Sequence, residues 1–513
     1  MPTEQPEPKI ELEVKNFGPI AEAKIHLRPL TVFVGPNNTG KSYLATLIYA
    51  LHDLLLRTVE DGKEATSRFF DQLGSLVDES ELDEIAYWVR KELMRSSKEE
   101  ASSVHTPPQS FSDAVYKALS GNNEAATVVV RHIAKCIGVV EQSDQLIRHG
   151  ASEGAEVALM SSIPDPDNAS RTLEYRLFVS EWGYQLEDML SPNVDPPITI
   201  RPLFESRFPQ ASEIRKVLQI PTNAELRRSE AYERVRKSAN EMLTLHFGRL
   251  NSRAYYLPAD RTGVMHAHDV VVDAMIQSAQ YAGLQDSRDR AQMTGLLADF
   301  LRALLIDLGR YDPQESKVAG DIEERILSGE VNRRLTGAGH PRFAYRPKDW
   351  IEELPLTRVS SMVSELAPLV LFLKHLVEPG ETLIIDEPES HLHPEAQAEL
   401  ANQLAKLVKE GVRVVITTHS GWIVDQFANL VRMSELQPEN RSDLPGNDAL
   451  LVPQDVGVWL FEETSSGSGS TVKEINFDPD GVGYEPGYFG IADKQYNTWA
   501  EINNRLADAA RRV

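Results

Sequence analysis

Residues 35–42 read Gly-Pro-Asn-Asn-Thr-Gly-Lys-Ser, the complete G-x-x-x-x-G-K-[ST] pattern of a phosphate-binding loop. An apolar run, Leu30 to Val34, comes directly before this loop. Apolar residues at helical spacing follow it: Leu44, Leu47, Ile48, Leu51, Leu54 and Leu55. Because phosphate binding requires strand, loop and helix in this order, the context favours a functional loop over a chance match. We therefore expect an α/β fold that binds ATP or GTP.

The residue types within the loop indicate how it would hold a nucleotide. Its glycines allow backbone N–H groups to converge on the phosphates, and Lys41 can reach the β and γ oxygens. Ser42 offers a hydroxyl to Mg²⁺. The predicted nucleotide-binding residues are Gly35, Pro36, Asn37, Asn38, Thr39, Gly40, Lys41 and Ser42.

A second apolar run, Thr382 to Ile385, ends in Asp386 and Glu387. Open α/β sheets bind ligands at the carboxyl ends of their strands, where these two carboxylates would emerge. Asp386 is the predicted Mg²⁺ ligand, acting through a water molecule, and Glu387 is the predicted general base for the attacking water. A surface strand end that carries Asp-Glu by chance is the alternative.

A third buried run, Val412 to Thr417, leads into His419. One strand away from Glu387, this histidine can hydrogen-bond a γ-phosphate. Taken alone it would be read as a strand-end histidine with a structural partner. Its position favours a role in sensing the γ-phosphate.

The order of these parts resembles the ABC-type ATPase heads of SMC-like proteins and of the overcoming-lysogenization-defect (OLD) enzymes. The matching stretches are Val14–Ile20, residues 35–42, Tyr256–Arg261, Ser360–Leu366, Leu383–Pro394 and Thr417–Ser420. The resemblance implies a mixed central sheet with antiparallel strands at its N-terminal side and a large insertion after the P-loop. It also implies ATP as the nucleotide, since no base-reading motif is legible in the residues themselves.

The same resemblance implies an ATP site shared between two subunits. Ser360 and Ser361 fall where the family has its signature motif, and the segment through Glu365 would close on the partner's γ-phosphate. Met362 and Val363 replace the small residues that are usual there. Two serines that only cap the following helix are the alternative, and capping and phosphate contact are compatible.

Two further features of the family stretches concern ligands. By resemblance, Asp260 and Arg261 would lie near Mg²⁺ or the γ-phosphate. The segment from Pro388 to Pro394 would cross the dimer interface, and it contains His391 and His393. We do not expect zinc there, because no Cys or His partner stands at ligand spacing elsewhere.

Composition narrows the class of protein. With Cys136 as its one cysteine, the chain cannot form an internal disulfide, and no apolar run approaches the ~20 residues that span a bilayer. Its start is acidic and rich in proline, unlike a signal peptide. The net charge of −24 weighs against extended DNA contact without excluding it. We expect a cytoplasmic protein with no membrane contact.

The pattern along the chain predicts its organisation. Residues 1–58 form the first part of the head, 59–244 a mainly helical inserted arm, and 245–265 a return strand. Residues 266–346 form a helical and irregular subdomain, and 347–513 the second part of the head. Alternating residues predict an antiparallel pair at 9–15 and 23–27, and another pair at 456–461 and 472–477 around a Ser/Gly-rich turn.

Three functions are compatible with these features. The first is an ATP-driven switch, a homodimer or higher oligomer that controls a toxin or nuclease effector from a neighbouring gene and answers a phage-encoded trigger. The second is a DNA repair or recombination ATPase that clamps DNA, and the third a module that binds ATP without hydrolysing it. Glu387 argues against the third. We expect no intrinsic nuclease, since the segment after Ser470 is shorter than most domains.

Overall fold

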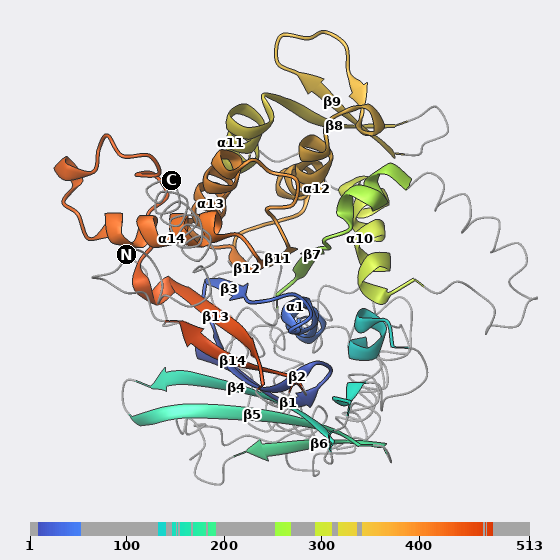
Figure 1. Ribbon diagram of the computed structural model, residues 1–513, viewed down its shortest axis with the longest axis vertical. Helices are drawn as coiled ribbons and strands as arrows, with labels where there is room; N and C mark the ends of the chain where they lie inside the picture. The colour runs from blue at the N-terminus through green and yellow to red at the C-terminus, as the bar shows by residue number, and fades with distance from the viewer. Residues whose placement is uncertain are drawn as a thin grey trace, which may run out of the picture.

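The protein is built on one large mixed sheet, seen in the computed structural model (Figure 1). The structure describes residues 9–52, 132–139, 146–149, 151, 154–165, 168–180, 183–190, 252–267, 293–309, 316–335, 341–464, 467 and 469–475. Within them, eleven strands pair in the order β6-β5-β4-β1-β2-β14-β13-β3-β12-β11-β7. The neighbours from β13 to β7 run parallel, and those from β6 to β2 run antiparallel.

The parallel half consists of β3 (Leu30–Val34), β7 (Ala254–Leu257), β11 (Thr382–Asp386), β12 (Arg413–Thr418) and β13 (Val456–Glu463). The antiparallel half consists of β1 (Lys9–Phe17), β2 (Ile20–Leu27), β4 (Ala155–Asp165), β5 (Asn168–Ser180) and β6 (Gly183–Leu190). Between the halves, β14 (Ser470–Ile475) pairs antiparallel with β13 and parallel with β2. The sheet is therefore continuous from the P-loop strand to the antiparallel wing.

The central strands are buried on both faces, and alternate residues feed two separate cores. In β3, Leu30, Val32 and Val34 belong to one core, whereas Phe33 belongs to the other. In β11, Ile384 likewise points to the opposite core from its neighbours Leu383 and Ile385. Near-continuous apolar runs are what parallel strands covered on both sides require.

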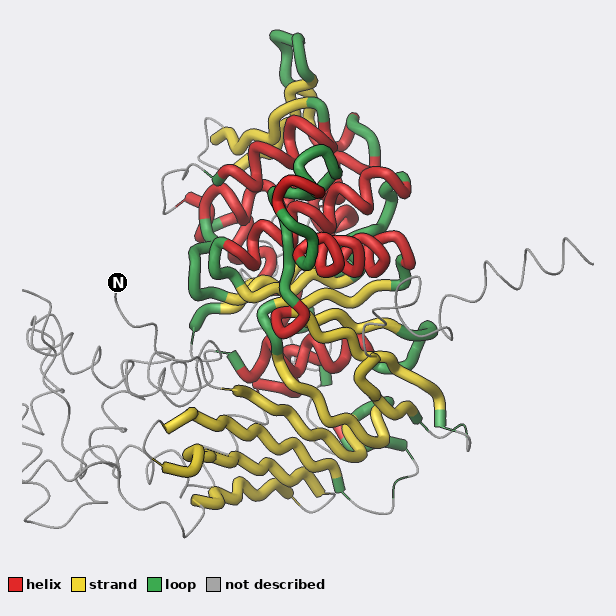
Figure 2. Tube along the Cα trace, turned by 90° about the vertical axis from the view of Figure 1, so that its left-hand side faces the viewer, coloured by secondary structure: helices red, strands yellow, loops and turns green. Residues whose placement is uncertain are grey.

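Helices cover the two faces of this sheet. α1 (Lys41–Leu51) packs on the face that also carries the antiparallel wing, while α12 (Ser361–His375), α13 (Pro394–Lys409) and α14 (Gly421–Ser434) cover the other. Figure 2 shows these three helices above the strands. α10 (Gly295–Leu305) and α11 (Lys317–Ile322) flank them, and α11 continues into a π-helical turn, η7 (Glu323–Leu327). Short 3₁₀ turns lie at η6 (Asp307–Gly309), η8 (Leu356–Arg358), η9 (Pro438–Asn440) and η10 (Pro453–Asp455).

A small second sheet lies next to α12. It pairs β8 (Gly329–Leu335), β9 (Pro341–Pro347) and β10 (Leu354–Pro355), all antiparallel. Val331, Phe343 and Tyr345 on one face join the core of the α12 side. The turn after β9 carries Trp350 and Ile351, which are 55% and 96% exposed.

Both expected antiparallel pairs are confirmed, as β1 with β2 and as β13 with β14. The helical prediction is wrong for residues 155–190, which form β4, β5 and β6 and extend the sheet beside β1. Within the predicted helical and irregular subdomain of residues 266–346, α11 and η7 are helical, but residues 329–335 and 341–346 form β8 and most of β9, strands that the prediction lacked. The rest of the predicted arm lies outside the described residues, apart from 132–139, 146–149, 151 and 154.

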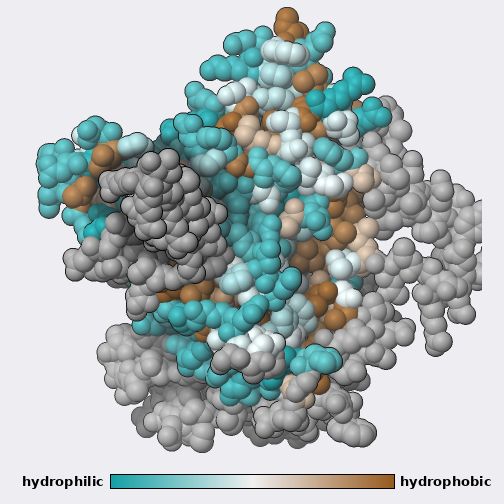
Figure 3. All heavy atoms as spheres, in the orientation of Figure 1, coloured by the Kyte–Doolittle hydropathy of each residue, from teal (hydrophilic) through white to brown (hydrophobic). Residues whose placement is uncertain are grey.

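The described surface on the side of Figure 3 is largely hydrophilic, with apolar residues in smaller groups. Among the described helices, none has both the length and the apolar character needed to cross a bilayer.

Candidate active site

The P-loop connects β3 to α1, and two of its glycines have conformations that other residues rarely adopt. Gly40 caps α1 with φ 97°, and a Cβ there would lie 2.9 Å from side-chain atoms of Pro19 and Ile20. At Gly35, with φ 146°, a Cβ would lie 2.5 Å from the carbonyl oxygen of Phe461. The glycine requirement of the sequence pattern is thus a requirement for space and for positive φ.

Lys41 folds back over the loop. Its Nζ donates to the carbonyl oxygens of Gly35 at 3.0 Å and Pro36 at 2.7 Å. Burial lowers the pKa of Lys41 to about 8, although the carboxylates of Glu387, Asp386 and Glu389 oppose this shift. A polyanion such as a nucleotide phosphate would restore the lost solvation of this ammonium group.

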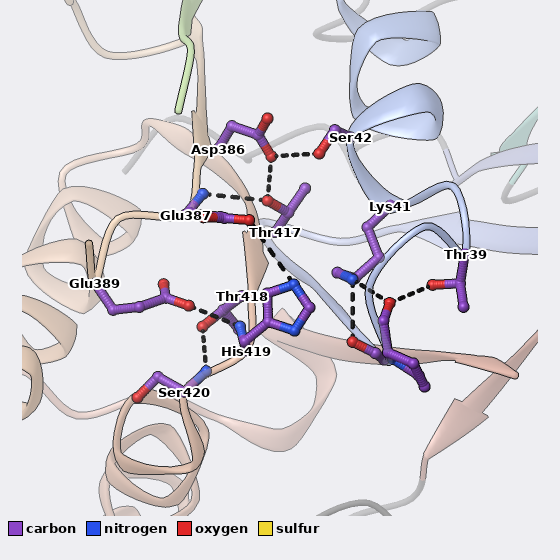
Figure 4. Close-up of polar contacts among 12 residues, drawn as sticks. Thr39, Lys41, Ser42, Asp386, Glu387, Glu389, Thr417, Thr418, His419 and Ser420 are labelled. Carbon is purple, nitrogen blue, oxygen red and sulfur yellow. Dashed lines mark hydrogen bonds and ion pairs between the residues drawn. The ribbon is translucent and has the colours of Figure 1, made fainter. Parts of the chain in front are cut away.

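Ser42 and Asp386 meet across the site (Figure 4). Ser42 Oγ donates to Asp386 Oδ1 at 2.8 Å, and Thr417 Oγ1 donates to the same carboxylate oxygen. A hydroxyl and a carboxylate are hard oxygen ligands, which Mg²⁺ prefers when phosphates complete its shell. These residues therefore fit Mg²⁺, which when bound would neutralise charge on the phosphates.

Glu387 and His419 lie side by side at the ends of β11 and β12. His419 Nε2 is 3.8 Å from Glu387 Oε1, and the Glu387 side chain is 41% exposed. Burial, and then the charge of Lys41, lower the pKa of His419 below its ordinary value. At neutral pH the imidazole is thus uncharged, and Glu387 is open to a water molecule.

Glu389 is a site residue that the motifs did not single out. Its Oε1 accepts the main-chain N–H of His419 at 2.7 Å, so it joins the segment after β11 to the histidine after β12. Burial raises the pKa of Glu389. The third acidic residue of the Asp-Glu-Pro-Glu run was the signal for it in the sequence.

Arg261 is buried, and its guanidinium is hydrogen-bonded to main-chain carbonyl oxygens. Four of its N–H groups donate to the carbonyl oxygens of Asp386, Glu387, Pro258 and Glu365. Its Nη2 also lies 2.5 Å from Glu365 Oε1, and both side chains are 1% exposed. Four hydrogen bonds and one ion pair hold this guanidinium within the protein, so Arg261 and Glu365 are placed to support the main chain of Asp386 and Glu387. Asp260, by contrast, is exposed.

Ser360 and Ser361 lie at the exposed start of α12. Ser360 Oγ accepts the N–H of Val363 at 3.4 Å, so the capping role is present. His391 and His393 are exposed in the segment before α13, where His393 Nδ1 accepts the N–H of Glu395. Contact of any of these residues with a second subunit stays a prediction.

Comparison with known proteins agrees with this picture. Residues 9–105 and 292–424 match the sequence profile of the AAA ATPase domain (AAA_15). No curated protein sequence matches this chain. The profile match and the geometry of the loop and strand ends together support an ATPase domain with a P-loop on a mixed α/β sheet.

Solved structures of SMC heads resemble the chain remotely. An Smc head bound to the C-terminal winged-helix domain of ScpA has 12% identity and a TM-score of 0.38, covering 92% of this chain and 98% of that chain. An Smc head with an extended coiled coil, bound to the C-terminal domain of ScpA from Pyrococcus furiosus, has 12% identity and a TM-score of 0.37, with 97% and 100% covered. The SMC head of Thermotoga maritima has 11% identity and a TM-score of 0.33, with 92% and 100% covered.

Proposed function

We propose that this chain is an ATP-hydrolysing switch whose nucleotide state controls a separate effector protein. One observation supports the hydrolytic part of this proposal. Lys41, Glu387 and His419 lie close together at one edge of the sheet, and the hydrogen-bonded pair of Ser42 and Asp386 lies beside them. In phosphoryl transfer, Lys41 would hold the phosphates, Glu387 would activate water and His419 would contact the γ-phosphate.

In the proposed cycle, ATP binds one head through the P-loop and the start of α12 from a second copy closes over it. The exposed Ser360 and Ser361 suit that role, because the first turn of a helix presents free N–H groups to an anion. Glu387 then removes a proton from the attacking water, and loss of the γ-phosphate opens the interface. His419, uncharged and beside Glu387, reports whether the γ-phosphate is present.

The biological setting that we propose is bacterial anti-phage defence, with a toxin or nuclease as the effector and a phage product as the trigger. Support comes from the resemblance of the head stretches to OLD-like ATPases and, within them, to the ATPase subunit of the PARIS defence system. A chain of net charge −24 also suits a protein partner better than an extended nucleic acid.

A DNA-clamping ATPase is the second candidate, and the outer face of β8 and β9 favours it. Arg334, Arg342 and Arg346 are on that face. Arg334 and Arg346 are already paired with Glu353 and Glu330, however, which reduces the charge available to phosphates. We therefore rank this candidate below the switch.

Affinity purification of the Glu387→Gln protein, expressed with its neighbouring genes, separates the two candidates. This variant should bind ATP and stay closed. A stoichiometric protein that remains bound after nuclease treatment supports the switch and identifies its effector. DNA that copurifies without a protein partner supports the clamp.

A further inference from the structure

Helix residues 261–267, between β7 and the described start of α10, touch both the proposed signature segment and the catalytic turn. Arg261 donates to the carbonyl oxygens of Asp386 and Glu387 at 2.7 and 3.1 Å. On its other side it pairs with Glu365 of α12 and donates to that residue's carbonyl oxygen at 3.1 Å. One buried guanidinium thus joins α12 to the main chain of the two catalytic acids.

The same short helix makes a second attachment to α12. His266 Nε2 lies 3.0 Å from Ser364 Oγ, and Thr262 Oγ1 donates to Glu365 Oε2. Ser364 and Glu365 are both buried, one turn after the exposed Ser360 and Ser361. A displacement of the first turns of α12 would therefore move Arg261 with them.

The turn that Arg261 supports is conformationally demanding. Glu387 has φ 48°, a left-handed conformation that a non-glycine residue adopts only when its surroundings enforce it. Its N–H donates to Thr417 O at 3.1 Å, and Arg261 binds its carbonyl oxygen. The Glu387 N–H also lies 3.2 Å from Thr417 Oγ1, and the Ser390 N–H donates to the Glu387 carbonyl oxygen at 3.2 Å. Without the guanidinium, this carbonyl oxygen would keep the bond from Ser390 but lose its attachment to α12, and the direction of the Glu387 side chain would be less restrained.

We propose that Arg261 and Glu365 form a positioning pair that couples the start of α12 to the catalytic turn at Asp386 and Glu387. Closure of α12 on one nucleotide then sets the catalytic acid of the same subunit in the geometry for hydrolysis. The expected effect of this pair on ATP turnover rests on the proposed function. The mechanical link itself consists of contacts within one chain.

Two variants and one control test this coupling. Glu365→Gln keeps the shape of the side chain but removes its charge. The double variant Arg261→Met with Glu365→Met removes both charges from the buried site, a replacement that folded proteins usually tolerate. Lys374→Met is the control, because Lys374 forms another α12 ion pair, with Glu323 at 2.6 Å, away from the catalytic turn.

ATP affinity without Mg²⁺, kcat and KM with Mg²⁺, and amide hydrogen exchange of residues 383–390 are measured for each protein. We expect both test variants to bind ATP like wild type and to keep KM, with kcat lower by roughly 10- to 100-fold. Their catalytic turn should exchange at least about tenfold faster. Lys374→Met should match wild type in kcat and exchange.

Wild-type kcat and wild-type exchange in the double variant would overturn the proposal, because the pair would then serve stability alone. If wild-type protein itself fails to hydrolyse ATP, the proposed function fails. The exchange data still decide the coupling in that case: slow exchange in both test variants contradicts it, and faster exchange than in Lys374→Met supports it.

Discussion

Three residues around the proposed nucleotide site occupy environments that are costly in free energy. Lys41 loses solvation by burial, Glu389 is a buried carboxylate, and Glu387 holds a left-handed backbone conformation that costs about 1–3 kcal/mol. Such costs collect at sites where geometry serves chemistry more than stability. The neighbours that impose these environments are therefore as informative as the groups that we propose to be catalytic.

Glu389 provides a prediction at this scale. Since its Oε1 accepts the His419 N–H, Glu389→Gln keeps an acceptor oxygen and should retain most of the turnover. Glu389→Ala removes it, frees the segment that carries His419, and should lower kcat about tenfold or more with little change in ATP affinity. Steady-state kinetics of the two variants test this, and equal kcat values for Ala and Gln would show that the hydrogen bond has no positioning role.

His52 provides a second prediction at the residue scale, which concerns the pH dependence of the free energy of unfolding. It is fully buried between Ile48 O and Thr382 Oγ1, and burial lowers its pKa from 6.5 to about 3. The unfolded chain, in which the pKa is 6.5, therefore binds the proton more readily than the folded protein. The contribution of neutral His52 to the free energy of unfolding is fully present above pH 6.5 and is lost as the pH falls toward 3. At pH 5 the loss from this residue should be about 2 kcal/mol.

Urea unfolding at pH 7 and pH 5 measures that loss. His52→Gln should lose about 2 kcal/mol less than wild type between the two pH values, whatever its stability at pH 7. His391→Gln, a change at an exposed histidine, should behave like wild type. Equal pH dependence in His52→Gln and wild type would mean that the imidazole is not buried in its neutral form.

At the scale of elements, the two serines at the start of α12 allow helix capping and phosphate binding to be tested separately. Ser360→Ala removes a cap and should cost about 1 kcal/mol of stability. Ser361→Ala is at an exposed first position without a capping bond, so it should leave stability unchanged and lower kcat if it contacts the partner's nucleotide. Thermal unfolding together with turnover distinguishes the two roles, and unchanged kcat in both variants would leave the segment with capping alone.

The sequence predicted those helices and strands whose pattern lies within a few neighbouring residues. The strand and helix that flank residues 35–42, the strand that ends at Asp386, and the strand pairs β1 with β2 and β13 with β14 depend on short-range spacing, and the structure confirms these elements. The strands β4 to β6 were missed: β4 pairs with β1, which lies more than a hundred residues away in the chain, and β5 and β6 continue the sheet from β4. A position near Mg²⁺ or the γ-phosphate stays a prediction for Arg261, and nothing local in the sequence reveals that main-chain carbonyls and Glu365 take up its donors.

At the scale of the whole molecule, a shared site predicts complementation between two inactive variants. Lys41→Ala disables the P-loop and Ser361→Arg blocks the start of α12, so each protein alone should be inactive. A mixed dimer contains one site built from the intact P-loop of one copy and the intact α12 of the other. Mixing should recover up to roughly a quarter of wild-type turnover. No recovery, under conditions where mixed dimers are shown to form, would contradict a composite site.

ATP turnover and affinity of wild type, Lys41→Ala and Glu387→Gln, measured side by side, test the assignment of the site most directly. We expect wild type to hydrolyse ATP, Lys41→Ala to lose binding and turnover together, and Glu387→Gln to bind ATP with wild-type affinity but turn it over at least about a hundredfold more slowly. Wild-type affinity in Lys41→Ala, or wild-type turnover in Glu387→Gln, would contradict the roles assigned to these two residues.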